Sequence, residues 1–362
     1  MTNKSTTSAI LGTGSYIPSR RIKNEEFLDH EFYDSNGKKL NKSNQEIIDK
    51  FLEITAIEER RYVTDDLVTS DIAYYAALKA IESSQTDAED LDYIIVAHNF
   101  GDVKKGHKSL DIVPSLASRV KHKLGIKNPR TIAYDLPFGC PGWLQGIIQA
   151  DYYIRSGDAS KVLVIGADVL SRISDPHDRD SMLYADGAGA TVLEARNNES
   201  LPVGILAHGT RSDTLLHSQM LYMGKSYNPH LEDHGEVYLK MQGRKLYQYA
   251  LEHVPQAIKD CLEKCKVQLK DVKKVLIHQA NGKMDDAIIE RLYKLYGLDE
   301  MPEFALPMTI SWLGNASVAT IPTLLDLILK GEMQDHDLKP GDLVVFASVG
   351  AGMNINAVVY RF

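Results

Sequence analysis

The chain has 362 residues, of which 44% are hydrophobic and 25% charged, a composition typical of a soluble globular protein. Its net charge of −8 argues against a general nucleic-acid binder, and no run of about 18 apolar residues is present to cross a membrane. Three cysteines and a polar N-terminus without the pattern of a secretory signal predict a reducing cytoplasm rather than a disulfide framework.

Strand-like and helical segments alternate along the first half of the chain. Apolar runs predict buried strands at residues 9–11, 93–97, 131–134, 162–166 and 190–193, and helical patterns occupy residues 71–84 and 141–155. Turn chemistry in Asp34-Ser35-Asn36-Gly37 predicts an irregular surface excursion over residues 30–44. This order of elements predicts an α/β fold, and a polar stretch at 196–200 suggests two units, 1–196 and 197–362.

The second half repeats the alternation of strands and helices seen in the first. We expect helices at residues 240–264, 284–296 and 317–330, and strands at 272–278, 343–348 and 357–362. Residues 91–99 resemble residues 272–281, since each is a strand with polar groups at its carboxyl end, and the glycine-rich run 186–190 resembles 349–353. These echoes predict an internal duplication with two similar halves.

Cys140 lies between an extended apolar segment and an amphipathic helix. Asp135 and Gly139 suggest a turn before it, and Pro141 suits a first helical position. A thiol at a helix N-terminus has a lowered pKa and becomes a nucleophile as the thiolate. The alternative is a buried cysteine that acts as a small apolar side chain, and this segment alone leaves both interpretations open.

Three further features lie at predicted strand or helix ends. His278 ends an apolar strand, where a structural histidine is the common case, and Asn315 precedes a helix, where it would by default be a cap. Residues 350–352, Gly-Ala-Gly, suggest a tight corner. Because strand carboxyl ends in an open α/β sheet converge on one crevice, the thiol, imidazole and carboxamide could share one site.

Together these segments resemble the β-ketoacyl-acyl-carrier-protein synthase III branch of the thiolase-like condensing enzymes. The resemblance covers nearly the whole chain. It rests on residues 11–18, the Cys140 turn, 164–170, 175–179 and 186–190, and on His278-Gln279-Ala280-Asn281, Gly314-Asn315-Ala316-Ser317 and the turn at Gly350. It implies a five-layer αβαβα sandwich of two similar halves, usually assembled as a homodimer.

The resemblance also implies an acyltransferase that performs a decarboxylative Claisen condensation in fatty-acid, specialised lipid or polyketide biosynthesis. Cys140 would take an acyl group from a thioester, while His278 and Asn315 would stabilise the enolate of a malonyl group on acyl-carrier protein. The backbone N–H of Cys140 and one from Gly350, Ala351 or Gly352 would hold the later oxyanion. No metal or redox cofactor is implied, because the coenzyme A or phosphopantetheine thioester is itself substrate.

The family pattern suggests binding residues around the entrance. Arg179 and Asn281 match substrate-binding positions, Lys283 matches a basic docking position, Arg291 lies on the same helix, and Arg244 falls near the pantetheine entrance. A solvated helix face is the alternative for these cations. Lys50 and Ile54 stand where the family carries a Trp and an Arg that grip coenzyme A. This departure favours an acyl donor on carrier protein.

Other functions use the same residue types. Non-decarboxylative condensation and simple acyl transfer by Cys140 are alternatives, and such a condensation would need a carboxylate base near the thiol, for which Asp111 and Glu59 are the candidates. The order Cys, His, Asn also occurs in papain-like hydrolases, the remaining alternative. A loop is favoured over a zinc site at residues 230–234, His-Leu-Glu-Asp-His, and a turn over a dinucleotide site at residues 12–16.

Overall fold

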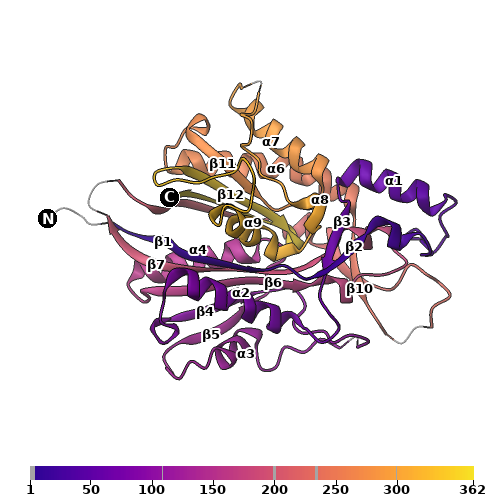
Figure 1. The fold of residues 1–362 in the computed structure, drawn as a ribbon. Helices are drawn as coiled ribbons and strands as arrows, with labels where there is room; N and C mark the ends of the chain where they lie inside the picture. The colour runs from indigo at the N-terminus through magenta and orange to yellow at the C-terminus, as the bar shows by residue number, and fades with distance from the viewer. Residues whose placement is uncertain (1–4, 108, 199–200, 233–234, 299) are drawn as a thin grey trace.

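Two β-sheets form the frame of the molecule in this computed structural model (Figure 1). The structure describes residues 5–107, 109–198, 201–232, 235–298 and 300–362. The first sheet has the strand order β1-β7-β6-β4-β5, and the second has the order β11-β12-β13-β8. All strands of the first sheet precede all strands of the second in the chain.

The strands of the first sheet are β1 (Ser5–Tyr16), β4 (Tyr93–Ala97), β5 (Ile132–Leu136), β6 (Lys161–Val169) and β7 (Asp186–Asn198). Those of the second are β8 (Gly204–Ser212), β11 (Val272–Ile277), β12 (Leu343–Gly350) and β13 (Asn354–Arg361). Two small antiparallel pairs lie outside these sheets, β2 (Arg20–Lys23) with β3 (Glu59–Tyr62), and β9 (Leu221–Gly224) with β10 (Tyr238–Met241).

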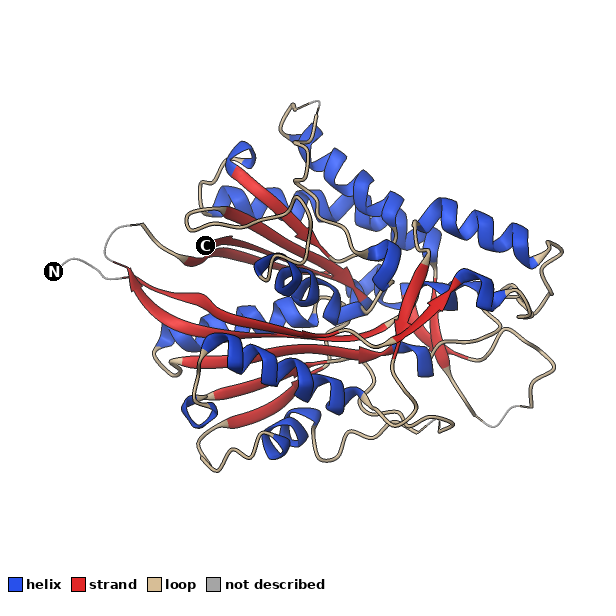
Figure 2. Cartoon of the chain, in the orientation of Figure 1, coloured by secondary structure: helices blue, strands red, loops and turns tan. Residues whose placement is uncertain are grey.

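The helices are α1 (Asn44–Thr55), α2 (Thr69–Ser84), α3 (Leu116–Lys123), α4 (Gly142–Ser156), α5 (Thr214–His217), α6 (Gly243–Lys264), α7 (Gly282–Leu295), α8 (Ile310–Leu313) and α9 (Thr320–Leu329). Helices α2 and α3 cover the outer face of the first sheet, and α6 and α7 cover the outer face of the second. Helices α4 and α9 lie between the sheets and pack against both (Figure 2). The predicted five-layer αβαβα sandwich is confirmed.

Strand β6 shows how the sequence encodes a covered sheet. Every residue from Val162 to Val169 is buried, because helices cover both faces of a sheet in this arrangement. Val162 and Val164 pack in the central layer, whereas Leu163 and Ile165 pack toward α2 and α3. Successive side chains of β6 therefore point alternately to the central helix layer and to the outer helix layer, and neither face of the strand is polar.

The two sheets share one connectivity. Along β1-β7-β6-β4 the successive pairs are antiparallel, antiparallel and parallel, and the same sequence of pairings runs along β8-β13-β12-β11. Strand β5 extends only the first sheet, in parallel with β4. The echo between residues 91–99 and 272–281 corresponds to β4 and β11. The boundary after residue 196 lies within β7, and the division into 1–196 and 197–362 remains a proposal.

Several local predictions differ from the structure. The helix expected from residue 240 begins at Gly243, because residues 238–241 form β10, and the helix expected from 317 begins at Thr320 after a short 3-10 turn at Ser317–Ala319. Helix α1 was not predicted, although Ser43 and Glu46 form a capping box at its start. The irregular segment 30–44 does bury Phe32 and Tyr33.

The glycines near the start of the chain lie within β1 rather than in the predicted turn. A Cβ atom on Gly14 would lie 2.4 Å from the carbonyl oxygen of Ala76, so the glycine allows α2 to pack directly on the strand. Among the described helices, none is long and apolar enough to cross a membrane.

Candidate active site

Cys140 lies in the short turn that joins β5 to α4. Gly139 adopts a positive φ of 65°, and Pro141 is the N-cap of α4 rather than its first residue. Asp135, expected in the turn, belongs to β5, and its carboxylate accepts hydrogen bonds from the N–H groups of Leu116 and Ala117, each at 2.8 Å. The tightness of the turn therefore comes from Gly139, while Asp135 anchors α3.

Cys140, His278 and Asn315 line a single cavity. Three segments that are far apart in the sequence therefore meet, as the convergence of strand ends predicts. The rest of the wall is largely apolar and includes Phe100, Leu170, Leu221, Leu239, Met241 and Leu246. Such a cavity suits an acyl chain with a few placed polar groups at the reacting end.

His278 directly follows β11 and is 5% exposed. Burial lowers the pKa of His278 to about 4, so the imidazole is neutral at pH 7. Its Nδ1 atom has no hydrogen-bond partner among the described residues. The ring therefore reaches the cavity as a neutral group able to donate one N–H.

Asn315 is fixed by its own neighbours in the chain and by the first half. Its Oδ1 atom accepts the backbone N–H of Ser317 at 2.9 Å, which leaves the amide nitrogen as the group free to donate. Its backbone forms a bridge with Tyr184. A Cβ atom on Gly166 would lie 2.4 Å from the carbonyl oxygen of Val318, so this glycine of β6 allows the Asn315 segment to approach.

The thiol of Cys140 does not have the lowered pKa that its place before a helix predicts. Burial raises its pKa to about 11, the hydrogen bond from the Ser317 hydroxyl (3.3 Å) acts in the opposite direction, and the charge of Asp168 raises it further. The prediction was wrong because the apolar cavity wall outweighs the helix terminus. Cys140 is therefore a thiol, not a thiolate, at pH 7.

The glycine-rich turn 350–352 lies against the backbone of Cys140. A Cβ atom on Gly350 would lie 2.6 Å from the Cys140 nitrogen, and one on Gly139 would lie 2.8 Å from the Ala351 nitrogen. Ala351 also lines the cavity, and Gly352 has a positive φ of 99°. Side chains at these glycines would separate the two turns, so the glycines bring both backbones to the same cavity wall.

The predicted binding residues are less closely connected to the cavity. The Arg179 side chain is 62% exposed, with Asp180 at 3.9 Å, and the Asn281 side chain accepts the Met284 N–H as the N-cap of α7. Lys283 lies beside the cavity residue Met284 but pairs with Glu53 of α1 at 3.3 Å. Arg244 and Arg291 are exposed, and within the described part of the chain neither forms an ion pair.

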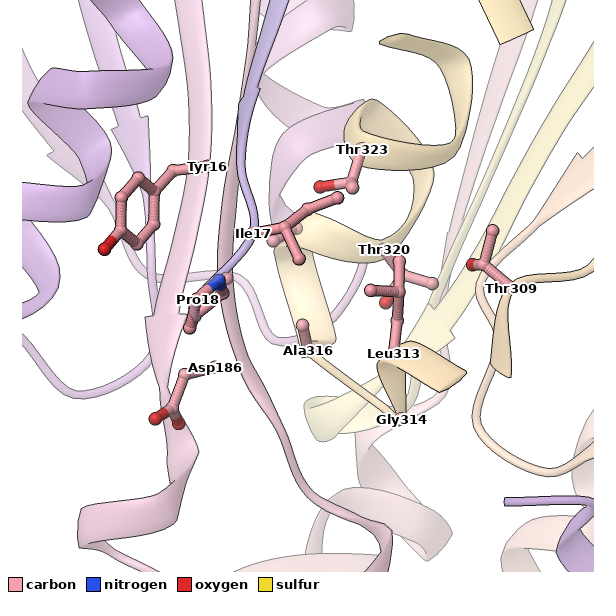
Figure 3. A pocket seen from close by; sticks show the side chains of 12 residues that line it. Tyr16, Ile17, Pro18, Asp186, Thr309, Leu313, Gly314, Ala316, Thr320 and Thr323 are labelled. Carbon is pink, nitrogen blue, oxygen red and sulfur yellow. The ribbon is translucent and has the colours of Figure 1, made fainter. Parts of the chain in front are cut away.

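A second cavity lies between the end of β1, the start of β7 and the start of α9 (Figure 3). Gly314 and Ala316 line this second cavity, whereas Asn315 and Ser317 line the first. The segment 314–317 therefore forms a thin wall between the two. Apart from this wall, the second cavity contains none of the predicted site residues.

The residues weighed for other functions lie away from the cavity wall. Glu59 pairs with Arg21 at 2.7 Å, and Asp111 pairs with Arg119 at 2.5 Å. Over the described ranges, His, Cys, Asp and Glu side chains form no group that could hold a metal ion. Asp233 and His234 of the 230–234 segment lie outside those ranges.

Sequence reasoning missed part of the cavity. The pair β9–β10 supplies Leu221, Leu239 and Met241 to the wall, but residues 240–241 had been assigned to a helix. Asn99 and Ser317 also line the cavity. Their polar positions after a strand and before a helix were visible signals, although a cap was the simpler explanation.

Comparisons with known proteins agree with this geometry. Residues 134–212 match the family model for 3-oxoacyl-acyl-carrier-protein synthase III, and residues 262–362 match the model for its C-terminal part. A β-ketoacyl-acyl-carrier-protein synthase III of Halalkalibacterium halodurans is 31% identical over 99% of both chains. One of Erythrobacter litoralis is 30% identical over 98% of this chain and 99% of the relative.

Solved structures give the same result. The 3-oxoacyl-acyl-carrier-protein synthase III of Aquifex aeolicus superposes with a TM-score of 0.77 at 29% identity, covering 98% of this chain and 100% of that one. The Thermus thermophilus enzyme gives 0.78 at 29% identity, covering 98% and 99%. The papain-like alternative is not favoured by any of these matches. The chain belongs to the 3-oxoacyl-acyl-carrier-protein synthase III family, acyltransferases that condense acyl thioesters with decarboxylation.

Proposed function

We propose that Cys140, His278 and Asn315 carry out the decarboxylative Claisen condensation of this family. The observation that supports these roles is the single, mostly apolar cavity that all three residues line. A thiol, a neutral imidazole and a carboxamide are the groups that acyl transfer followed by enolate formation requires.

In the first half-reaction, the Cys140 sulfur attacks the carbonyl carbon of an acyl thioester. The bond from that carbon to the donor's sulfur breaks, and the thiol proton ends on the departing donor thiol. Because burial holds the pKa of Cys140 near 11, proton loss must accompany the attack rather than precede it. The backbone N–H groups of Cys140 and of the 350–352 turn receive the transient oxyanion.

In the second half-reaction, a malonyl thioester replaces the departed thiol. Loss of carbon dioxide leaves an electron pair that becomes an enolate, and the N–H of His278 and the amide of Asn315 stabilise its oxygen. Both donors are neutral, since the pKa of His278 lies near 4. The enolate carbon then attacks the acyl carbonyl and the bond to the sulfur of Cys140 breaks, which gives a β-ketoacyl thioester. The leaving sulfur takes up a proton from solvent, which restores the thiol.

The acyl donor is a carrier-protein thioester in this proposal. Lys50, at a position where the family holds a residue that grips coenzyme A, pairs with Glu53 at 2.8 Å, and Glu53 also pairs with Lys283. Arg244 lies two residues before the cavity residue Leu246, on the first turn of α6. With Lys283 and Arg291 on α7, it supplies positive charge for an acidic carrier protein.

We also propose a cytoplasmic homodimer that uses no metal or organic cofactor. Strand β5 ends the first sheet and every residue in it is at least partly exposed, with Ile132 48% exposed. Open strand edges with apolar side chains pair readily with another chain. Two copies that joined through β5 would extend the sheet across the dimer.

Intact mass measurement tests the proposed chemistry. The protein would be mixed with the same acyl group on coenzyme A and on acyl-carrier protein, and the mass gain compared over time. We expect acylation of Cys140, faster from carrier protein. The matched variants are Cys140→Ala, which should gain no mass, and Cys261→Ala, which should gain mass normally. Acylation that persists in Cys140→Ala would reject the nucleophile.

A further inference from the structure

A row of buried polar groups runs from the nucleophile into the first half of the molecule. The hydroxyl of Ser317 lies 3.3 Å from the Cys140 sulfur, and the Asn99 amide nitrogen lies 2.9 Å from that hydroxyl. The same nitrogen donates to Oδ2 of Asp168 at 2.6 Å, and the backbone N–H of Asn99 donates to Oδ1 at 2.9 Å. Ser317 is 4% exposed and Asp168 is 1% exposed.

The chemistry of these groups determines which atoms donate and which accept. A carboxylate only accepts, so Asp168 orients the Asn99 amide with both N–H bonds committed, one to Asp168 and one to Ser317. The Ser317 oxygen therefore accepts from Asn99. Its own hydrogen can be donated to the sulfur of Cys140 at 3.3 Å, and the carboxylate of Asp168 is a second acceptor within its reach.

The unusual backbone conformation of Ser317 indicates that its hydroxyl has a functional role. Ser317 has a φ of +51°, in the left-handed region where glycine is the relaxed choice. Its N–H also holds Oδ1 of Asn315 at 2.9 Å. Ser317 therefore contacts both Asn315 and Cys140, and its hydroxyl supplies the hydrogen bond to the sulfur.

We propose that Asn99 and Asp168 are positioning residues that hold the Ser317 hydroxyl as a hydrogen-bond donor to the Cys140 sulfur. This inference rests on the proposed role of Cys140 as nucleophile. A donor directed at sulfur stabilises the thiolate that forms during attack and opposes the burial that disfavours it. Asn99 touches no reacting atom and acts through Ser317, whereas the charge of Asp168 also acts directly on the thiol.

The other titratable groups near the sulfur do not supply this bond. Asp168 carries a negative charge that opposes the thiolate, and the buried Tyr184 and the neutral His278 line the same cavity. All three remain in place when Ser317 or Asn99 is replaced. A change in thiol reactivity in those variants therefore reports the relay.

The test is the rate of alkylation of Cys140 by iodoacetamide as a function of pH, read by peptide mass. For Ser317→Ala we expect the midpoint of the profile to rise by about one pH unit, hence about tenfold slower alkylation below it. Asn99→Leu should show most of that shift. The double variant should match Ser317→Ala alone, because Asn99 has no other route to the sulfur.

Ser15→Ala is a matched control, since the Ser15 hydroxyl donates to the buried carboxylate of Asp326 at 2.6 Å and lies away from the cavity. It should lower the unfolding temperature without moving the alkylation profile. Asn99→Ala repeats the measurement if Asn99→Leu does not fold. An unchanged midpoint in Ser317→Ala, or additive shifts in the double variant, would overturn the relay. Wild-type protein that takes no acyl group on Cys140 would instead overturn the proposed function.

Discussion

The two halves of the molecule place a histidine at the same point, directly after β4 and directly after β11, and use it in opposite ways. His98 Nδ1 accepts the N–H of Gly101 at 3.0 Å, and its Nε2 donates to Asp135 at 3.1 Å. His278 lines the cavity, with Nδ1 unpartnered among the described residues. One histidine is committed to structure, and the other is free for chemistry.

The residues that follow these histidines have the opposite roles, because the one after His98 lines the cavity and the one after His278 is structural. Asn99 lines the cavity, whereas Gln279 donates to the carbonyl of Pro307 at 2.9 Å and accepts the N–H of Thr309 at 2.8 Å. Successive residues of an extended chain point in opposite directions, and the residue that lines the cavity is the second after the strand in the first half and the first after the strand in the second half. A duplicated fold can thus yield two different polar groups from nearly the same strand ending.

The largest expected effect distinguishes the cysteine of the first half from the buried Cys261 of the second. Cys140→Ala should abolish acylation and condensation but keep some malonyl decarboxylation, because His278 and Asn315 remain. Cys261 is 2% exposed in the core, and Cys261→Ala should keep both activities at a cost of about 1 kcal/mol in stability. Product mass and carbon dioxide release measure the two reactions. Equal loss of both reactions in Cys140→Ala would contradict the assigned roles.

The two histidines give the next largest contrast. His278→Leu, which has no side-chain N–H, should slow malonyl decarboxylation by about 10²–10³, the usual cost of one lost donor to a developing oxyanion, with little change in unfolding temperature. His98→Gln should lower the unfolding temperature, because it disturbs buried bonds to Asp135 and Gly101. Decarboxylation rates and thermal unfolding, measured on both variants, check this. Similar rate losses in the two variants would remove the distinction between them.

Local signals in the sequence predicted the alternation of strands and helices and marked the three central side chains as candidates, whereas the five-layer arrangement and the roles of those side chains came from the family resemblance. Buried strands such as β6 are continuous apolar runs, and Cys140, His278 and Asn315 each stand at a strand or helix end. The pKa of Cys140 could not be predicted in this way. It depends on apolar walls contributed by β9 and β10, which follow the thiol in the chain by some eighty residues or more.

The short elements escaped prediction for a physical reason. Strand β10 has four residues and leads almost directly into α6, so its apolar residues fit a helical pattern equally well. The capping box of α1 is a local signal, but the helix packs against α7, which is more than two hundred residues away in the chain. Tertiary contacts, rather than the propensity of each short segment, decide these cases.

The free edges of the two sheets also differ, and assembly should follow that difference. Strand β11 is mostly buried, and the N–H of Val275 on it donates to the carbonyl of Ala305 at 2.8 Å. Every residue of β5, by contrast, is at least partly exposed. We expect Ile132→Lys to weaken the proposed homodimer by about 2–5 kcal/mol, because a charge would be buried at the joined edges.

Sedimentation velocity at several concentrations measures this effect. Leu215→Lys, at a residue that is 93% exposed on α5, is the matched surface change and should leave assembly unchanged. A wild-type protein that sediments as a monomer at all concentrations would contradict the dimer. Dissociation by Leu215→Lys alone would place the interface elsewhere.

The smallest expected effect is the pH dependence that the free histidine imposes on stability. The pKa of His278 is about 4 in the folded chain and about 6.5 when unfolded, so between these values the unfolded state binds more protons. Stability should therefore fall as pH drops from 6.5 to 4, by up to about 3 kcal/mol. Asp168, with a folded pKa of about 6, acts in the opposite direction over that window.

A difference measurement isolates the histidine, because Asp168 is common to both proteins compared. Urea unfolding of wild type and His278→Gln at pH 7 and pH 4.5 should show that the wild type loses about 2–3 kcal/mol more on acidification. His98→Gln should not remove this extra loss, since His278 is still buried without a charge partner. Parallel stability curves for wild type and His278→Gln would mean that the folded pKa of His278 equals its unfolded value, which would contradict the effect of burial described here.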